Sequence, residues 1–121
     1  MGRVFELQEA LDLMPKVKDL TKPVFELAAS LAEELQESDE QEDETRAEEL
    51  RDRLQVLVES WAEAIRELGA EVKGLWLVDF DSGDGYWCWA YPEETLEYWH
   101  SYEGGFSSRM LIALKPEFRQ V

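Results

Sequence analysis

Residues 37–44 read Glu-Ser-Asp-Glu-Gln-Glu-Asp-Glu and contain no apolar side chain. A segment with nothing to bury stays in solvent, so this stretch predicts a mobile polar tip between two flanking elements. Before the tip, apolar residues recur every three or four positions, at Val17, Leu20, Val24, Leu27, Leu31 and Leu35. After it, from about Thr45 to Leu68, the same spacing returns at Ala47, Leu50, Leu54, Leu57, Trp61, Ala64 and Leu68. Heptad spacing on both sides is typical of helices packed side by side and predicts a long antiparallel helical hairpin.

Prolines and a glycine mark the expected ends of these helices. Residues 5–14 predict a separate short N-terminal helix, because Pro15 suits the first turn of a new helix. Pro23 interrupts the next apolar pattern, so that either Thr21 caps a helix that restarts there or Pro23 kinks a continuous helix. Gly69 follows the second long helix at a position where helices commonly end in a left-handed residue.

The second half of the chain has the composition of a small antiparallel sheet. Runs of aromatic and β-branched residues alternate with turns that contain Gly, Asp or Pro, which is the pattern of short strands. The predicted strands are 75–80, 86–91, 95–100 and a shorter one within 110–114. Three or four short strands are not stable alone, so one face of the sheet must pack on the hairpin or on a second copy of the chain.

These elements predict the α+β class and a single domain over residues 1–121. Its expected parts are the helical hairpin at 1–69, an aromatic-rich sheet at 70–114 and a tail at 115–121. The register of the strands stays open, because the turn at 81–85 allows more than one pairing. A slip of one residue moves Asp79 to the other face of the sheet.

The charge of the chain limits its partners. There are 28 acidic and 12 basic residues, for a net charge of −16. This charge repels nucleic-acid phosphates and anionic lipids, so we expect neither nucleic acid nor a membrane as partner, whereas a basic protein or a cation suits the surface. No apolar signal core and no long apolar run is present, which favours the cytoplasm. Cys88 is the only cysteine, which excludes an internal disulfide and a four-cysteine zinc site.

The expected core is small for so elongated a molecule. A chain of 121 residues that includes a long hairpin leaves much apolar surface exposed, and a dimer buries more of it. Together with the two heptad runs and the aromatic excess, this favours a non-catalytic protein-interaction or small-ligand-binding module that acts as a homodimer.

Six short motifs follow one another in the second half: Gly74-Leu75, Leu77-Val78-Asp79-Phe80, Cys88-Trp89, Tyr98-Trp99-His100, Gly105-Phe106 and Arg109. In this order they resemble a small bacterial family, the domain-of-unknown-function family 2203, which also opens with a short helix and a Leu/Met-Pro step like Leu13-Met14-Pro15. The resemblance implies no activity. It implies that eight residues form one constellation: Asp79, Cys88, Trp89, Trp99, His100, Gly105, Phe106 and Arg109. The chain departs from the family at Trp76, where a Gly is usual, and at Tyr91-Pro92-Glu93, which replaces a Gly-Glu step.

His100 is the only histidine, and two interpretations of it stay open. As a functional residue it is a general base or a metal ligand, and with Asp79 and Cys88 it completes a nitrogen, sulfur and oxygen ligand set. As a structural residue it hydrogen-bonds a carboxylate, either Asp79 or Glu97. Two interpretations of Cys88 also stay open: a nucleophile with His100 as its base, or a small core residue. Acidic and apolar surroundings favour the core residue, because they raise the pKa of a thiol.

Arg109 is an isolated positive charge in an acidic chain. Its structural role would be a salt bridge to Asp79, and its functional role would be to bind a carboxylate or phosphate ligand beside His100. The candidate binding cluster is Asp79, Cys88, Trp89, Trp99, His100 and Arg109. The alternative function is therefore a metal-dependent site or enzyme built from Asp79, Cys88, His100 and Arg109. No catalytic residue is assigned, and the one cofactor considered is a divalent metal at Asp79, Cys88 and His100.

Overall fold

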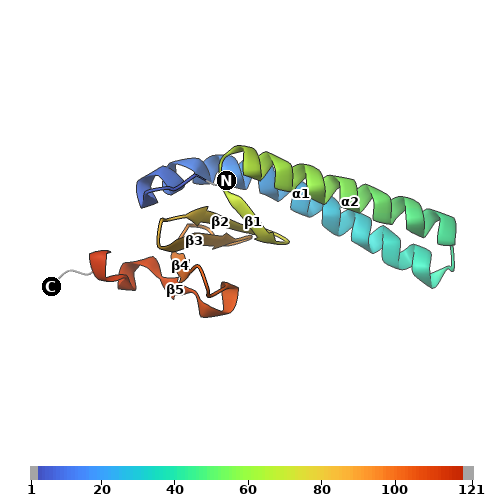
Figure 1. The fold of residues 1–121 in the computed structure, drawn as a ribbon. Coiled ribbons are helices and arrows are strands. Elements are labelled where there is room, and N and C mark those ends of the chain that lie inside the picture. Colours follow the sequence, from blue (N-terminus) through green and yellow to red (C-terminus); the bar gives the residue numbers. More distant parts are fainter. Residues whose placement is uncertain (1–2, 119–121) are drawn as a thin grey trace.

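Two long helices form the predicted hairpin in the computed structural model, which describes residues 3–118 (Figure 1). Helix α1 spans Leu7–Glu40 and helix α2 spans Glu44–Glu67. Helix α2 ends as the sequence predicts, because Gly69 follows it with a φ of 94°, a conformation that glycine adopts without steric cost. The helices lie side by side along their length, and this confirms the hairpin.

The predicted short helix at 5–14 is wrong, because α1 continues through both Pro15 and Pro23. Both prolines are exposed, so water can satisfy the carbonyl groups that lose a backbone partner. Thr21 does not cap a new helix. Its hydroxyl is buried, donates to the Val17 carbonyl at 2.7 Å and accepts a hydrogen bond from Trp61 Nε1 at 2.9 Å. Thr21 therefore ties α1 to α2 at the depth of the core.

The polar tip is shorter than residues 37–44. Helix α1 includes the first four of these residues, and its buried Ser38 donates to the Glu34 carbonyl at 3.0 Å. Asp43 then caps α2, because its side chain accepts from the Arg46 backbone N–H at 3.1 Å. The turn is thus confined to residues 41–43. Local side-chain hydrogen bonds of this kind are not visible in the apolar pattern that predicts the hairpin.

Five antiparallel strands follow in chain order as a meander. They are β1 (Glu71–Gly74), β2 (Leu77–Asp81), β3 (Gly85–Ala90), β4 (Tyr98–Ser101) and β5 (Met110–Leu111). The α+β class is confirmed, with one strand more than the three or four expected. The additional strand is β1, and residues 75–76, expected in the first strand, form the turn after it, where Trp76 has a φ of 65°.

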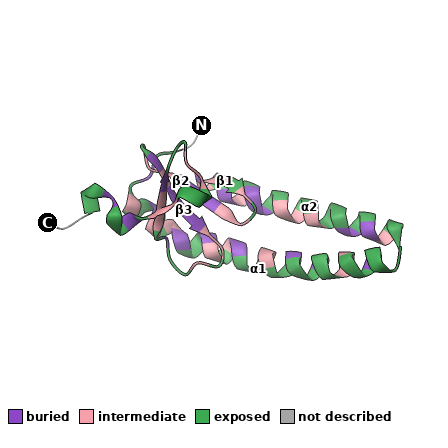
Figure 2. Ribbon diagram, turned by 90° about the horizontal axis from the view of Figure 1, so that it is seen from below, coloured by how far each residue is buried: buried purple, intermediate pink, exposed green. Residues whose placement is uncertain are grey.

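The sheet packs one face against the base of the hairpin, and the far part of the hairpin extends beyond it (Figure 1). Val78, Phe80, Trp87 and Trp89 on this face are at most 5% exposed and join the buried core with Phe5. The Phe5 and Phe80 rings meet edge to face, 5.2 Å apart. Figure 2 shows the buried residues concentrated where the sheet meets the helices. The hairpin therefore supplies the cover that a small sheet needs.

The C-terminal segment is attached to the sheet rather than extended as a tail. Strand β5 has two residues, and the 3₁₀ helices Ile112–Leu114 and Pro116–Phe118 follow it. Lys115, the first residue of the predicted tail, is 4% exposed, and its ammonium pairs with Asp84 at 3.0 Å and lies 3.7 Å from the Trp99 ring centroid. Residues 119–121 of that tail lie outside the described part. Within residues 3–118, neither long helix contains a stretch apolar enough to cross a bilayer.

Candidate functional site

The strand register decides which polar residues meet. Asp79 lies opposite Cys88 in the β2–β3 pair, and Tyr86 lies opposite His100 in the β3–β4 pair. Residues directly opposite one another share a face, and alternate residues of a strand point the same way. Asp79, Cys88 and His100 therefore lie on one face, and because their neighbours Val78, Phe80 and Trp87 belong to the core beneath the hairpin, this is the face turned away from the helices.

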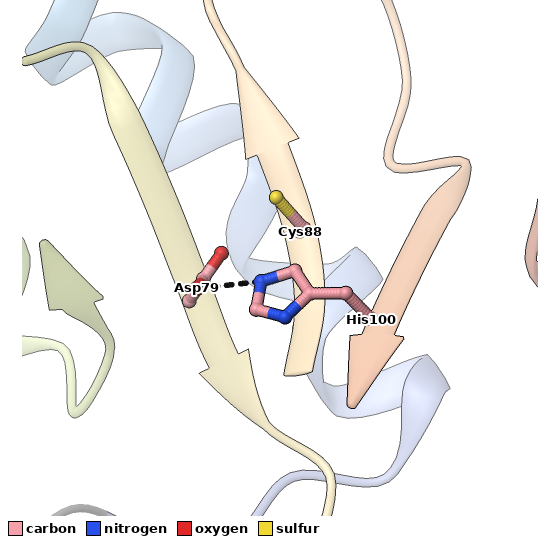
Figure 3. A group of neighbouring side chains, drawn as sticks. All are labelled: Asp79, Cys88 and His100. Carbon is pink, nitrogen blue, oxygen red and sulfur yellow. Dashed lines mark hydrogen bonds and ion pairs between the residues drawn. The ribbon is translucent and has the colours of Figure 1, made fainter. Parts of the chain in front are cut away.

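Three side chains from three adjacent strands converge on this outer face (Figure 3). Asp79, Cys88 and His100 are at most 4% exposed. One ligand atom of each, a carboxylate oxygen, Sγ and an imidazole nitrogen, lies within 4.8 Å of the other two. The cluster is buried although it lies on the face opposite the helices, because the loop residues 104–106 and the rings of Tyr86 and Tyr102 surround it.

The imidazole of His100 is held in one tautomer. Its Nδ1 lies 2.8 Å from the Ser101 carbonyl oxygen, which can only accept, so Nδ1 carries a proton. Its Nε2 faces Asp79 Oδ2 at 3.0 Å, with one proton between the two atoms. The predicted hydrogen bond between His100 and Asp79 is thus confirmed, whereas the alternative partner, Glu97, accepts from Thr95 instead.

Asp79 has an unsatisfied oxygen. Among the described residues, its Oδ1 is the one buried side-chain polar atom without a hydrogen-bond partner. Burial raises the pKa of the Asp79 carboxyl, and the neighbouring Cys88 and His100 offset this only in part. A buried carboxylate oxygen without a partner costs free energy, and such atoms are rare in folded proteins.

Cys88 is a protonated thiol at neutral pH in this environment. Burial raises the pKa of the Cys88 thiol far above its usual range, and the charge of Asp79 raises it further. A thiol attacks as its thiolate, so this environment does not support Cys88 as a nucleophile activated by His100. A bound metal ion would change this, because a coordinated thiol is deprotonated outright.

The predicted salt bridge between Arg109 and Asp79 is wrong. The guanidinium of Arg109 donates to both carboxylate oxygens of Glu93, at 3.0 and 2.9 Å. It also lies between two rings, 4.1 Å from the Tyr98 centroid and 3.9 Å from the Phe106 centroid. Arg109 nevertheless borders the cluster, because Tyr98, whose ring it contacts, lies opposite Cys88 in the β3–β4 pair. Its charge opposes the rise in the pKa of the Cys88 thiol. Four of the six candidate residues therefore gather in one place.

The two tryptophans of the predicted cluster lie on the other face of the sheet. Trp89 is fully buried beneath the hairpin and its Nε1 donates to the Glu93 carbonyl at 2.8 Å. Trp99 donates from Nε1 to Ser82 Oγ at 3.0 Å and stacks under Lys115. Both have structural contacts, and neither pairs with Asp79 or shares its face of the sheet, although Trp89 pairs with the neighbouring Val78.

A cavity of about 220 Å³ opens onto the cluster. It is lined by Lys73, Leu77, Asp79, Tyr86, Cys88, His100, Tyr102, Gly104, Gly105 and Phe106. The sequence interpretation missed Lys73, Tyr86 and Tyr102 here, and missed Glu93 as the partner of Arg109. Tyr86 lies two positions before Cys88 on β3, so both side chains point to the same face of the sheet. A known strand register would have placed Tyr86 beside His100. Lys73 had no such signal, because β1 was not recognised as a strand.

Comparison with known proteins yields a family and no activity. Neither the curated proteins nor the solved structures contain a significant match to this chain. A family model described as "Uncharacterized conserved protein (DUF2203)" matches residues 3–112, which covers both helices and all five strands. The match agrees with the resemblance that the motifs from Gly74 to Arg109 indicate, and the chain belongs to the uncharacterised conserved protein family DUF2203.

Proposed function

We propose that this protein binds one divalent transition-metal ion, zinc in the first place, through Asp79, Cys88 and His100, and presents it to a small molecule. The observation that carries the proposal is the set of three buried ligand atoms within 4.8 Å of one another, with Asp79 Oδ1 left without a partner. Three protein ligands that leave one position open are the arrangement of reactive rather than structural zinc sites.

The spacing of the three atoms suits a metal after a small adjustment. Tetrahedral zinc with typical bond lengths places its ligand atoms roughly 3.3–3.6 Å apart. Starting from separations of at most 4.8 Å, the side chains need to close by about 1 Å or a little more, which rotation of the Cys88 and Asp79 side chains can supply. All three residues line the same cavity, so an ion held by them faces that cavity.

The protons of the cluster are arranged as a metal site requires. A ligating histidine commonly donates its second ring N–H to a carbonyl, and the Nδ1–H of His100 does this with Ser101. The lone pair of Nε2 is then free to bind the metal in place of the proton shared with Asp79. Metal binding releases this proton and the proton of the Cys88 thiol, and it satisfies the unpartnered oxygen.

Elemental analysis of chelator-treated and zinc-loaded protein tests the proposal. We expect one zinc ion per chain in the wild type after dialysis, and less than a tenth of that in Asp79→Asn. Asp81→Asn is the matched control, since it makes the same change in charge on the same face of β2 and should retain the metal. Wild-type protein that holds no zinc, or an Asp79→Asn variant that loads as fully as the wild type, would refute the site.

A second candidate function is interaction with another copy of the chain through the hairpin. Leu27 and Val56 are 48% and 63% exposed. With Leu31 and Leu57 they form the apolar part of a groove of about 410 Å³ between the two helices, which Asp52, Arg53 and Ser60 also line. Exposed apolar patches of this kind are typical of interaction surfaces. This supports the homodimer as a proposal that a direct measurement of mass must decide.

Light scattering during size-exclusion chromatography tests the dimer. We expect twice the chain mass for the wild type at micromolar concentration, and the chain mass for Val56→Glu, which places a charge in the groove. Gln55→Glu adds the same charge to the neighbouring exposed position and should stay dimeric. A wild-type monomer would refute the homodimer.

A cytoplasmic location is also part of this proposal, because a thiol ligand for a metal must stay reduced, as it does in that compartment.

A further inference from the structure

The cavity above the three ligands is suited to a small anionic ligand. Its volume of about 220 Å³ is below the range of pockets that hold drug-sized molecules, so it selects for ligands of few atoms. Its walls include the rings of Tyr86, Tyr102 and Phe106, and Lys73 is the one lysine or arginine that lines it. The floor is formed by the three side chains that the proposed function assigns to the metal.

Lys73 has a fixed position and an unused donor. Its ammonium is paired with Glu71 at 2.9 Å, donates to the Tyr86 hydroxyl at 3.2 Å and lies 4.4 Å from the Tyr86 ring centroid. An ammonium has three N–H donors, and these contacts take two of them. The side chain is 41% exposed and lines the cavity, so the third donor can reach a ligand there. Hydrogen bonds from Lys73 to Glu71 and Tyr86 raise its pKa despite partial burial, and the group stays charged.

The two tyrosines cannot take the place of this donor. The Tyr102 hydroxyl donates to Asp81 Oδ1 at 2.6 Å, and the Tyr86 hydroxyl accepts from Lys73 and faces Glu71 at 3.5 Å. Their protons are directed to carboxylates outside the cluster. Lys73 is therefore the one Lys or Arg among the residues that line the cavity. With zinc bound to a thiolate and a carboxylate, the floor would be electrically neutral and would still accept one oxygen ligand.

We propose that the cavity binds a small carboxylate, with one carboxylate oxygen on the metal and the negative charge facing the Lys73 ammonium. The proposal rests on the metal site of the proposed function and adds the chemical class of its ligand. The two contacts have different roles. The metal binds any oxygen donor, and Lys73 selects an anion over a neutral amide or an alcohol. The aromatic walls limit the ligand to a short carbon skeleton.

Cobalt-substituted protein allows the metal and the ligand to be observed separately. Cobalt(II) bound to Cys88 gives a thiolate-to-cobalt charge-transfer band, and its visible spectrum reports a change at the open position. Acetate is the probe, and acetamide is its uncharged isostere. We expect acetate to change the visible spectrum with saturation, and acetamide to bind at least about tenfold more weakly, a factor that corresponds to the strength of a charge-assisted contact.

Lys73→Met tests the selecting residue, and Lys16→Met, an exposed lysine on α1, is the matched control. We expect Lys73→Met to retain the charge-transfer band and to bind acetate roughly five- to tenfold more weakly, because the partner is partly exposed. Lys16→Met should bind acetate as the wild type does. A Lys73→Met variant that keeps wild-type affinity for acetate would refute the proposal, and so would equal binding of acetamide and acetate.

The two proposals fail in different ways. If the metal site is wrong, no charge-transfer band forms on addition of cobalt, in the wild type or in any variant. If the metal site is right and the ligand class is wrong, the band forms but acetate does not alter the visible spectrum. Tighter binding of methylammonium than of acetate, measured by calorimetry, would also overturn the anion and assign the aromatic walls to a cation.

Discussion

Replacing Asp79 by Asn separates the stability of the cluster from its affinity for metal. Burial raises the pKa of Asp79 in the folded state above the ordinary value of 3.8. The stability from this group is therefore fully present below about pH 3.8 and is lost as the pH rises through the folded pKa. Burial of this carboxyl group thus opposes folding of the metal-free protein above that range, and Asn removes this cost.

The substitution also weakens the contact with His100. A charge-assisted hydrogen bond contributes about 1.5–3 kcal/mol and a neutral one about 1 kcal/mol, and the amide N–H of Asn can still donate to Nε2. The loss and the relief of burial oppose each other, so the metal-free Asp79→Asn protein should unfold within about 1 kcal/mol of the wild type. This is a small change for a fully buried charged position, where loss of a needed partner costs several kcal/mol.

Zinc should stabilise only the wild type. At a free metal concentration of about 100 times the Kd, binding adds about 2.7 kcal/mol to the free energy of unfolding. For a chain of this length that corresponds to roughly 8–13 °C in Tm. If the loss of the Asp79 ligand weakens zinc binding about 100-fold, the gain at the same concentration falls to about 0.4 kcal/mol, or roughly 1–2 °C.

Thermal unfolding followed by circular dichroism, with and without zinc, measures both quantities. Asp81→Asn should respond to zinc as the wild type does. A metal-free Asp79→Asn protein that loses more than about 3 kcal/mol would show that Asp79 is held for structure by His100. An equal rise of Tm with zinc in the wild type and in Asp79→Asn would place the metal elsewhere. Either result contradicts the reasoning from the unpartnered oxygen.

Three further predictions concern residues whose environments are equally specific. In the metal-free native protein Cys88 should not react with a disulfide reagent at pH 8, because burial and Asp79 raise the pKa of its thiol. In denaturant it should react at once, and rapid labelling of the native state would contradict the prediction. Thr21→Val should cost about 1–3 kcal/mol in denaturant unfolding, since Trp61 Nε1 loses its buried acceptor, and an unchanged midpoint would mean that water replaces it. The hydrogen bond to Asp81 raises the pKa of Tyr102 to about 12, so its contribution to stability is present below about pH 10 and is lost as the pH rises through about 12. An ultraviolet titration of Tyr102→Phe should lack a tyrosine that ionises near pH 12, and an unchanged signal near pH 12 would refute the assignment.

The helical hairpin was predictable because its signal is repeated. Apolar residues at heptad spacing on both sides of a polar tip leave few alternatives. Helix continuity at Pro23 was not predictable, since it depends on whether the proline faces water, and the apolar pattern carries no such information. The extra strand β1 was missed because its sequence, Glu-Val-Lys-Gly, has one β-branched residue and two charges, and it becomes a strand through pairing with β2.

The candidate site was predictable to the extent that it depends on alternation within strands. Val78 and Phe80 flank Asp79 and belong to the core, which directs Asp79 outward once β2 is paired with β3. Strand β3 has aromatic residues on both faces, so its composition does not distinguish the face of Cys88 from the face of Trp89. The strand register shows which face each residue occupies, because Cys88 pairs with Asp79 and Trp89 pairs with the buried Val78.

The partner of Arg109 shows where such prediction ends. Asp79 was the expected partner because a buried carboxylate needs one. The loop after β3 instead brings Glu93 to Arg109, whose Nη1 donates to both carboxylate oxygens at 2.9–3.0 Å. Asp79 is then left with His100 on one oxygen and no partner on the other. If Arg109 had paired with Asp79, the cluster would be a closed structural network. Because Arg109 pairs with Glu93, Asp79 Oδ1 has no hydrogen-bond partner. This unpartnered oxygen is the physical basis for proposing a metal at the cluster.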